Sequence, residues 1–297
     1  MEYEKIEIKD LNKLKTANIY YLLKHQNFSE NYIKKLRNCE NGILLNNLPT
    51  TTRQKISAND ILFVAKNPKS PTTIDECDGE IEPLFEDDDF LIVNKPHNLS
   101  CMPTRSHYGN NLGGQIVKYF RKKSQDFVLR IINRLDKDAS GIVIVAKNQI
   151  SANNINIEKC YHALCFGNAN FNETTIDKPI KTINENGVNQ IKRVIASDGK
   201  SAITHAYVIK QFDEYFLSEI KIETGRTHQI RLHMSSIGHP LLGDRLYANE
   251  QTIDMLQDLT NHTFLLLKKI SFTHFRTKQK ISIEVPYPIE WGKFIKK

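Results

Sequence analysis

One short stretch limits the fold of this chain more than any other. Residues 142–146 read I-V-I-V-A, and such an unbroken aliphatic run is typical of a strand that is buried on both faces of a sheet. Just before it, four charged residues crowd into positions 134–138, and Gly141 ends the loop. The sequence therefore predicts a charged loop held rigidly by a core strand, where reactive groups are well positioned. A solvated turn with a few ion pairs is the alternative interpretation.

The composition is that of an ordinary globular protein and favours a polyanionic partner. Its 297 residues are enough for one large and one small domain. The net charge is +7 at pH 7, which favours binding to a polyanion. No apolar run approaches the roughly 18 residues of a membrane span, and the first residues lack the order of a signal peptide. The five scattered cysteines form no C-x-x-C pair, so we expect free thiols in a reducing cytoplasm, not disulfides or a zinc site.

Residues 1–66 are predicted to form a small α/β domain. Apolar residues recur at helical spacing at positions 19–23 and 33–36, and Ser29 can cap the second of these helices. Asn46-Asn47 suits a tight turn, because asparagine tolerates positive φ. A strand-like I-L-F-V run closes the segment.

A linker and a second, larger domain are predicted to follow. Residues 67–83 contain three prolines and few large apolar residues, which indicates a linker. Residues 84–297 form the larger domain, and their F-L-I-V run at 90–93 predicts a buried strand.

Later stretches of the larger domain add further elements. Residues 216–223 alternate between apolar and polar and predict a half-buried strand. Helical spacing from Ile230 to Ile237 predicts a helix that ends at Gly238. Residues 168–200 predict an irregular excursion with a strand or two, and the tail predicts an alternating strand followed by a Pro-flanked aromatic strand.

The charged loop and three other stretches carry a resemblance to a known family. R-L-D-x-x-x-S-G from Arg134, followed by the aliphatic strand and A-K, resembles the catalytic motif of the pseudouridine synthases, specifically of the RluA type. The other stretches are N-K-P at 94–96, K-x-Y-x-A at 159–163, and G-R-T-H-Q-I-R-x-H at 225–233 followed by G-H-P-x-x-G-D. The resemblance implies an α+β fold with a large, mostly antiparallel mixed sheet, flanking helices and a basic cleft.

The N-terminal domain is similar to the small RNA-binding module first described in a ribosomal small-subunit protein. In that module the second helix faces RNA phosphates, and here the helix carries Lys34, Lys35 and Arg37. A solvated lysine face on a packing domain is the alternative.

The resemblance also implies a reaction. Pseudouridine synthases detach uracil from its ribose and reattach it through carbon, without a cofactor. The reaction needs an ionised carboxylate, and a neighbouring arginine opposes the rise in carboxyl pKa that burial causes. The family motifs place the catalytic group at Asp136 and the tyrosine that stacks on the flipped base at Tyr161. The arginine beside Asp136 is expected to be Arg226, with Arg231 as the second choice.

The remaining expected site residues contact the substrate. We expect RNA as the partner, ribosomal RNA first and transfer RNA second, a monomer, no membrane, no cofactor and no metal. The substrate-binding residues implied are Arg134, Arg231, His228, Gln229 and Lys95, together with Lys34, Lys35 and Arg37.

Two departures from the family pattern lie in the charged loop. Asn133 stands where the motif usually has histidine, and Ala139 where it usually has threonine. Both leave Asp136 in place, so we expect an active enzyme, and an unchanged or an altered substrate range is compatible with these two changes.

Three alternative functions are weighed against this one. A catalytically silent RNA-binding protein would not need the carboxylate. A metal hydrolase would use His228, His233 and His239, but their spacing suits one helix face poorly and no carboxylate sits at ligand spacing. Paired-carboxylate glycoside hydrolysis would need Asp136 and Asp138 to face each other, which a two-residue separation in a loop does not indicate.

Overall fold

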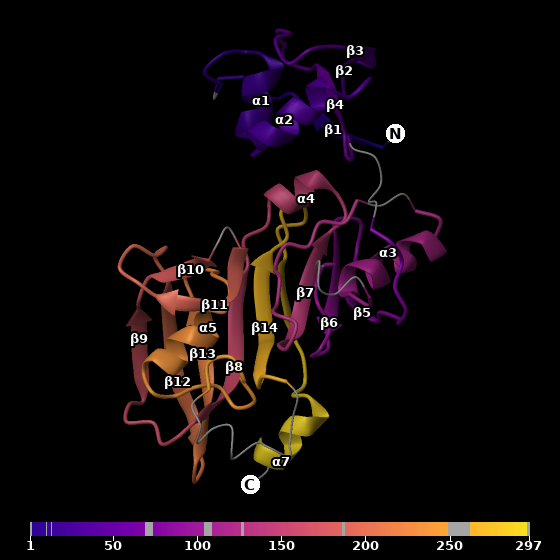
Figure 1. Cartoon of the computed structure of the whole chain (residues 1–297). Coiled ribbons are helices and arrows are strands. Elements are labelled where there is room, and N and C mark those ends of the chain that lie inside the picture. The colour runs from indigo at the N-terminus through magenta and orange to yellow at the C-terminus, as the bar shows by residue number, and fades with distance from the viewer. Residues whose placement is uncertain are drawn as a thin grey trace.

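The computed structural model describes residues 2–9, 11–12, 14–68, 74–103, 109–125, 128–185, 188–248 and 262–295. Two sheets with separate hydrophobic cores divide the chain into an N-terminal domain, which ends with the strand at Ala65, and a larger domain, which begins with the strand at Pro83 (Figure 1). Residues 69–73 of the predicted linker lie outside the described residues. Within the described ranges, no helix is long and apolar enough to span a membrane.

The N-terminal domain packs two helices against an antiparallel sheet with the strand order β1-β4-β2-β3. Ser29 caps the second helix as predicted, since its side chain accepts a hydrogen bond from the Tyr32 amide at 3.2 Å. Asn46 and Asn47 have φ values of 50° and 68°, which confirms the predicted turn. The first strand was not predicted. The elements are β1 Tyr3–Glu7, α1 Ile19–His25, α2 Glu30–Arg37, β2 Ile43–Leu45, β3 Leu48–Pro49 and β4 Ile61–Ala65.

The larger domain is built on a nine-stranded sheet, with β15 paired to β14 beside the main path β5-β6-β7-β14-β8-β13-β12-β9. All of its pairings are antiparallel except the one between β7 and β14, so the predicted mixed sheet is confirmed. The strands are β5 Pro83–Glu86, β6 Phe90–Lys95, β7 Ser140–Ala146, β8 Glu158–Phe166, β9 Glu173–Asp177, β12 Ile203–Gln211, β13 Tyr215–Ile222, β14 Leu265–Thr273 and β15 Lys280–Glu284.

Helices cover both faces of this sheet. Helix α3 (Leu112–Lys122) packs on the face that carries Val143 and Val145. Helix α5 (Gln229–Ser236) packs on the face that carries Ile142 and Ile144. Strand β7 is therefore buried on both sides, as its sequence predicts. The remaining elements are α4 Gln149–Asn153, the 3-10 helix η1 Ile289–Trp291, α7 Gly292–Ile295 and the two-stranded sheet β10 Ile180–Glu185 and β11 Val188–Ile195 (Figure 1).

The parallel pairing of β7 with β14 depends on Gly141. This residue lies opposite Leu267 with a φ of 118°. A Cβ atom here would lie 2.5 Å from the Leu267 carbonyl oxygen, a separation that real Cβ atoms do not show. Glycine is therefore required both by the backbone conformation and by the approach of the neighbouring strand.

Two predicted elements of the larger domain were wrong. The stretch 168–200 holds three strands, β9 to β11, and not an irregular excursion with one or two. The Pro-flanked aromatic stretch at the end is helical, because Pro288 precedes the first turn of η1 and Trp291 is buried against Phe264. Proline at the start of a helix is tolerated, whereas within a sheet it removes a ladder hydrogen bond.

The two domains touch through a small interface. Ile150 of α4 and Phe275 pack into the hydrophobic cluster of the N-terminal domain, and α4 lies at the end of the larger domain nearest to it (Figure 1). Arg276 links the domains electrostatically: its guanidinium binds Glu4 on one side and Asp89 on the other, with Nε 2.6 Å from Asp89 Oδ2.

Candidate active site

A cavity of about 690 Å³ lies on the α5 side of the large sheet. Its walls come from the charged loop before β7, from β8, and from the turn between β13 and α5. Among the described residues that line it, Asp136 is the one carboxylate, whereas six are cationic: Arg134, Lys137, Lys159, Arg193, Arg226 and Arg231. The cavity is therefore suited to an anionic substrate that meets a single carboxylate.

Lys95 anchors the loop that carries Asp136. Its Nζ donates hydrogen bonds to the carbonyl oxygens of Lys137 and Ala139 in that loop, at 3.2 and 2.6 Å. It also donates to Pro96 and Leu99 beyond β6. Burial lowers the pKa of Lys95 to about 8. Because Lys95 is fully buried, its expected role in contacting the substrate is wrong, and its role is to position the loop.

Arg231 supplies the ion pair to Asp136. Its Nη1 lies 3.6 Å from Asp136 Oδ2, while two 2.7 Å hydrogen bonds to Asp244 hold the guanidinium in place. Burial alone would lower the pKa of Arg231, but these bonds to Asp244 raise it above its ordinary value. Arg231 is therefore a permanently charged partner, rigidly aimed at the carboxylate.

Arg226, the residue expected first for this pairing, does not make it. Its side chain is exposed, and its Nε donates to the Ser201 carbonyl oxygen at 3.1 Å. It still lines the cavity. The correction has a simple cause: Arg226 lies in the turn before α5, whereas Arg231 lies on the inward face of that helix.

His228 completes the surroundings of Asp136. It precedes α5 in a left-handed conformation with a φ of 58°, and its Nε2 lies 4.0 Å from Asp136 Oδ2. Its Nδ1 is 3.0 Å from the hydroxyl of Tyr247. Burial lowers the pKa of His228, and the charge of Asp136 opposes that shift.

Asp244 and Tyr247 were missed by the sequence analysis as site residues. Asp244 is the last letter of the G-H-P-x-x-G-D motif, which was recognised without a role for this carboxylate. The Tyr247 hydroxyl accepts a hydrogen bond from the Arg193 amide at 2.8 Å, so it ties the β10–β11 hairpin to the site. The only available signal was the position of Tyr247 three residues after the motif.

Gln229 is not available to a substrate. Its Oε1 accepts hydrogen bonds from the Thr224 hydroxyl and the Arg226 amide, and its Nε2 donates to Ile203 and Thr204. The side chain is buried. The expected substrate contact is therefore wrong, and Gln229 instead holds the turn that carries Arg226.

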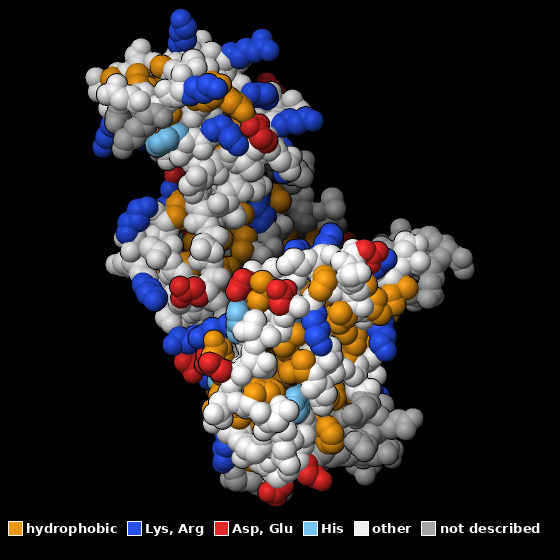
Figure 2. All heavy atoms as spheres, turned by 90° about the vertical axis from the view of Figure 1, so that its left-hand side faces the viewer, with side chains coloured by type: hydrophobic (Ala, Val, Ile, Leu, Met, Phe, Trp, Pro, Cys, Tyr) orange, Lys and Arg blue, Asp and Glu red, His pale blue; other side chains and the backbone are white. Residues whose placement is uncertain are grey.

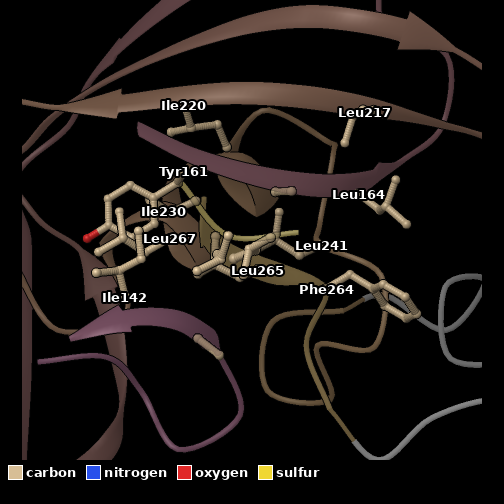
Figure 3. Packing of buried hydrophobic residues seen from close by; sticks show 14 of the residues in the cluster. Ile142, Tyr161, Leu164, Leu217, Ile220, Ile230, Leu241, Phe264, Leu265 and Leu267 are labelled. Carbon is tan, nitrogen blue, oxygen red and sulfur yellow. The ribbon is translucent and has the colours of Figure 1, made fainter. Parts of the chain in front are cut away.

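Tyr161 lines the cavity from the middle of β8, where it is only 6% exposed. Its ring packs near Ile142, Ile230 and Leu267, and its hydroxyl oxygen points away from the other labelled side chains (Figure 3). Burial and the charge of Asp136 both raise the pKa of Tyr161, so its hydroxyl stays protonated. Asp136 and Tyr161 are thus brought to one cavity, as predicted.

Asn133 takes a structural position. Its Nδ2 donates to the Ile142 carbonyl and its Oδ1 accepts from the Ile144 amide, at 2.9 and 2.8 Å. The side chain thereby pairs with β7 as a short piece of strand would. The departure from histidine therefore leaves the charged loop attached to the core.

The basic residues predicted to bind RNA fall into two places. Arg134 is exposed at the cavity. Lys34 and Arg37 are exposed on α2 and Lys35 is half-buried there, so these three belong to the N-terminal domain, whose surface carries several Lys and Arg side chains (Figure 2). The Arg37 Nε donates to the Thr52 hydroxyl at 2.8 Å.

The three histidines of the hydrolase alternative face different partners. His228 faces Asp136 and Tyr247, His233 is buried between Thr204 and the Lys178 carbonyl, and His239 contacts the Phe166 carbonyl. They form no ligand cluster among the described residues.

One group of potential ligands lies elsewhere: the donor atoms of Cys160, His162 and Glu219 are within 4.8 Å of one another on the other face of β8. Protein groups already engage two of them, because Glu219 pairs with Lys221 at 3.1 Å and His162 Nδ1 bonds the Tyr287 hydroxyl at 2.6 Å.

Comparisons with known proteins find similar sequences over most of the larger domain. Residues 89–236 match the family model described as RNA pseudouridylate synthase. The chain is 32% identical over 220 residues to the uncharacterized RNA pseudouridine synthase YjbO of Bacillus subtilis, covering 72% of this chain and 75% of that protein. It is 32% identical over 252 residues to the ribosomal large subunit pseudouridine synthase D of Zymomonas mobilis, covering 79% and 78%.

A solved structure has a similar fold. The human RNA pseudouridylate synthase domain containing 1 superimposes with a TM-score of 0.55 at 23% identity, over 73% of this chain and 86% of that one. The predicted α+β class with its large mixed sheet is confirmed.

Proposed function

The chain belongs to the RNA pseudouridylate synthase family, and on that premise we propose that it isomerises uridines of large-subunit ribosomal RNA with Asp136 as the catalytic group. The observation that carries this proposal is the ion pair between Asp136 and Arg231 in a cavity whose other charged lining residues, among those the structure describes, are all cations. A silent RNA-binding protein would have no use for a carboxylate placed among groups that attract phosphate.

The chemistry assigned to the site needs no redox partner. The bond between ribose C1′ and N1 of uracil breaks, the base turns, and a bond forms from C1′ to C5. C5 gives up one proton and N1 takes up one proton, so the product is an isomer of the substrate. The Asp136 carboxylate supplies the electron pair beside the ribose, and Arg231 keeps the carboxylate charged and fixed. Asp244 aims Arg231 and Lys95 holds the loop, so both act as positioning residues.

The target base must leave its stack in the RNA to reach Asp136 inside the cavity. We assign the base to the wall formed by Tyr161, and the flanking phosphates to the exposed cations at the rim, Arg134 and Arg226. In this assignment the side chains of Lys95 and Gln229 do not touch RNA.

The proposal has three further parts. Ribosomal RNA as the substrate is supported by relatives named ribosomal large subunit pseudouridine synthase D. Residues 1–66 are assigned as an RNA-binding module because α2 presents Lys34 and Arg37 to solvent, with 67–83 as the linker and 84–297 as the catalytic domain. We further assign the protein to the cytoplasm as a monomer.

Pseudouridine mapping tests the function directly. Unmodified large-subunit ribosomal RNA is incubated with the wild-type protein, with Asp136→Asn and with Asp138→Asn. We expect new pseudouridines at defined positions with the wild type and the Asp138 variant, and none with Asp136→Asn, which should still bind RNA.

The Asp138 variant is the matched control, because it makes the same chemical change two residues away. Loss of activity in both variants would favour a paired-carboxylate mechanism. Substantial product from Asp136→Asn would falsify the assignment of the catalytic group, and no product from the wild type would remove ribosomal RNA as the substrate.

A further inference from the structure

We propose that Lys159 binds a backbone phosphate adjacent to the target uridine, an assignment that rests on the proposed function. Lys159 is the first residue of the K-x-Y-x-A stretch on β8. It lines the same cavity as Asp136 and Tyr161.

The strand geometry directs Lys159 toward the substrate. Residues 159 and 161 are two positions apart on one strand, so their side chains leave the same face of the sheet about 6.6 Å apart. Lys159 lies opposite Ile270 of β14, and Tyr161 lies opposite Leu267. A base held at Tyr161 therefore has its own backbone within reach of the long lysine side chain.

Among the residues that the structure describes, no carboxylate pairs with the ammonium group of Lys159. Lys159 is half-buried, and among the described residues no hydrogen bond or ion pair of its Nζ is found. Burial lowers its pKa, and no nearby carboxylate offsets that shift. Taking a charge out of water without a partner is costly, so the site is arranged for an anion from outside.

Other lysines that are shielded from water have ammonium groups with hydrogen-bond partners inside the protein. Lys95 donates to four carbonyl oxygens, Lys147 binds Glu86 and the Asp87 carbonyl, and Lys268 binds Glu284 and the Val285 carbonyl. Lys178 donates to the carbonyl and hydroxyl of Ser236. Each of these ammonium groups is satisfied within the fold, and Lys159 differs from all of them.

The shape of the surroundings favours a polymer over a small anion. A second hollow of about 880 Å³ adjoins the cavity, and Lys159, Ile222 and Gly225 line both. No atom lies within 4 Å of the place where a Cβ of Gly225 would be. Lys159 thus stands where the two hollows meet, so a chain can enter from one hollow and leave by the other. The second hollow carries charges of both signs, because Glu158, Glu219 and Glu223 line it together with Lys221, Lys269 and Lys280.

The experiment compares Lys159→Gln and Lys159→Arg with Lys293→Gln in the full chain. Lys293 is an exposed lysine on α7 that does not line the cavity. The affinity of each protein for a transcript of large-subunit ribosomal RNA is measured against salt. Loss of one phosphate contact should reduce the log–log slope by about 0.7 to 0.9. Of the three variants, we expect only Lys159→Gln to bind more weakly and to show the smaller salt slope. Lys159→Arg should keep the affinity and the slope of the wild type.

Thermal unfolding separates binding from a structural role. Because the unpaired charge is removed, Lys159→Gln should melt at or above the temperature of the wild type without RNA. A clear loss of thermal stability would overturn the proposal and make Lys159 a structural group. Equal changes of slope in Lys159→Gln and Lys293→Gln would also overturn it, since they would report only the net charge.

Acetylation footprinting gives a readout that is independent of turnover. With the RNA transcript bound, Lys159 should react more slowly with an acetylating reagent than in the free protein. If inorganic phosphate alone slows the acetylation of Lys159 as much as the RNA does, the residue binds small anions and the proposed RNA contact is wrong. If the wild type forms pseudouridine but Lys159 is not protected, this inference fails alone. If Lys159 is protected but no uridine is converted, the proposed function fails and the contact remains.

Discussion

At the scale of single residues, the site depends on buried charges that are satisfied in different ways. Lys95 places an ammonium group among backbone carbonyls, and Arg231 is held between two carboxylates. Neither arrangement is visible in the sequence, because the loop carbonyls that Lys95 binds and the Asp136 carboxylate that Arg231 faces lie far from those two residues in the chain. They give opposite electrostatic consequences: burial lowers the pKa of Lys95, whereas Asp244 raises the pKa of Arg231 despite its burial.

The buried ammonium of Lys95 should appear in the pH dependence of stability. Its pKa falls from 10.5 to about 8 on folding, so between these values the unfolded chain binds more protons. The unfolding free energy contributed by this residue therefore rises with pH above about 8, by about 3 kcal/mol in all. Denaturant titrations of the wild type and Lys95→Met from pH 7 to 10.5 measure this effect. The unfolding free energy of the wild type minus that of the variant should increase with pH. A difference that does not depend on pH would contradict the assignment.

Arg231 and Arg226 should differ sharply when each is replaced by lysine. Arg231→Lys keeps a charge but loses the paired hydrogen bonds to Asp244, so kcat should fall on the order of 100-fold. Arg226→Lys should change kcat by a few-fold at most, because Arg226 is exposed and does not pair with Asp136. Single-turnover rates on a uridine-containing RNA check this, and the reverse order would restore Arg226 as the partner of Asp136.

At the scale of elements, three local signals were read correctly, whereas the strands within residues 168–200 and the helical turn at Ile289–Trp291 were not. The cap at Ser29, the turn at Asn46-Asn47 and the buried strand β7 each depend on a few neighbouring residues, and all three are confirmed. The choice between Arg226 and Arg231 depends on how α5 is rotated against the sheet. The spacing of residues along the chain does not specify that rotation, so the sequence analysis named both arginines but ranked them in the wrong order.

The burial of Tyr161 in β8 determines which variant is informative. Tyr161→Ala should destabilise the fold by about 3–5 kcal/mol, because it opens a cavity in the core. Tyr161→Phe keeps the ring and should leave stability within about 1 kcal/mol of the wild type. If the ring stacks on the base, Tyr161→Phe should retain most of the turnover. Chemical denaturation and single-turnover assays measure the two effects, and severe loss of activity in a stable Tyr161→Phe would assign the role to the hydroxyl.

At the scale of the whole molecule, the N-terminal domain rests on the larger domain through contacts of modest size. Ile150 and Phe275 provide the apolar part, and Arg276 bridges Glu4 and Asp89. Asp89 also accepts hydrogen bonds from Ser151 and Asn148, so it remains satisfied when Glu4 is removed. The larger domain is therefore expected to fold without its partner, with an apolar spot left uncovered at Ile150.

Removing residues 1–66 should separate binding from turnover. If α2 contacts phosphates, the truncated chain should bind RNA more weakly, and each lost contact should reduce the log–log salt slope by roughly 0.7 to 0.9. Single-turnover rate at saturating RNA should persist, because Asp136, Tyr161 and Arg231 remain. A full chain with Lys34→Gln, Lys35→Gln and Arg37→Gln is the control, since it loses the charges without uncovering Ile150. An unchanged slope in both would make the N-terminal domain a packing element.

The steric demand at Gly141 has a consequence for how such chains diverge. Strand β14 leaves no room for a side chain at position 141, whether or not the chain is a catalyst. Asp136, in contrast, is required by the proposed reaction. A descendant that abandoned catalysis would thus keep its glycine as long as it kept its shape, while its aspartate would be free to drift. Glycine at position 141 therefore indicates a shared fold, whereas the residue at position 136 indicates whether a related chain is still a catalyst.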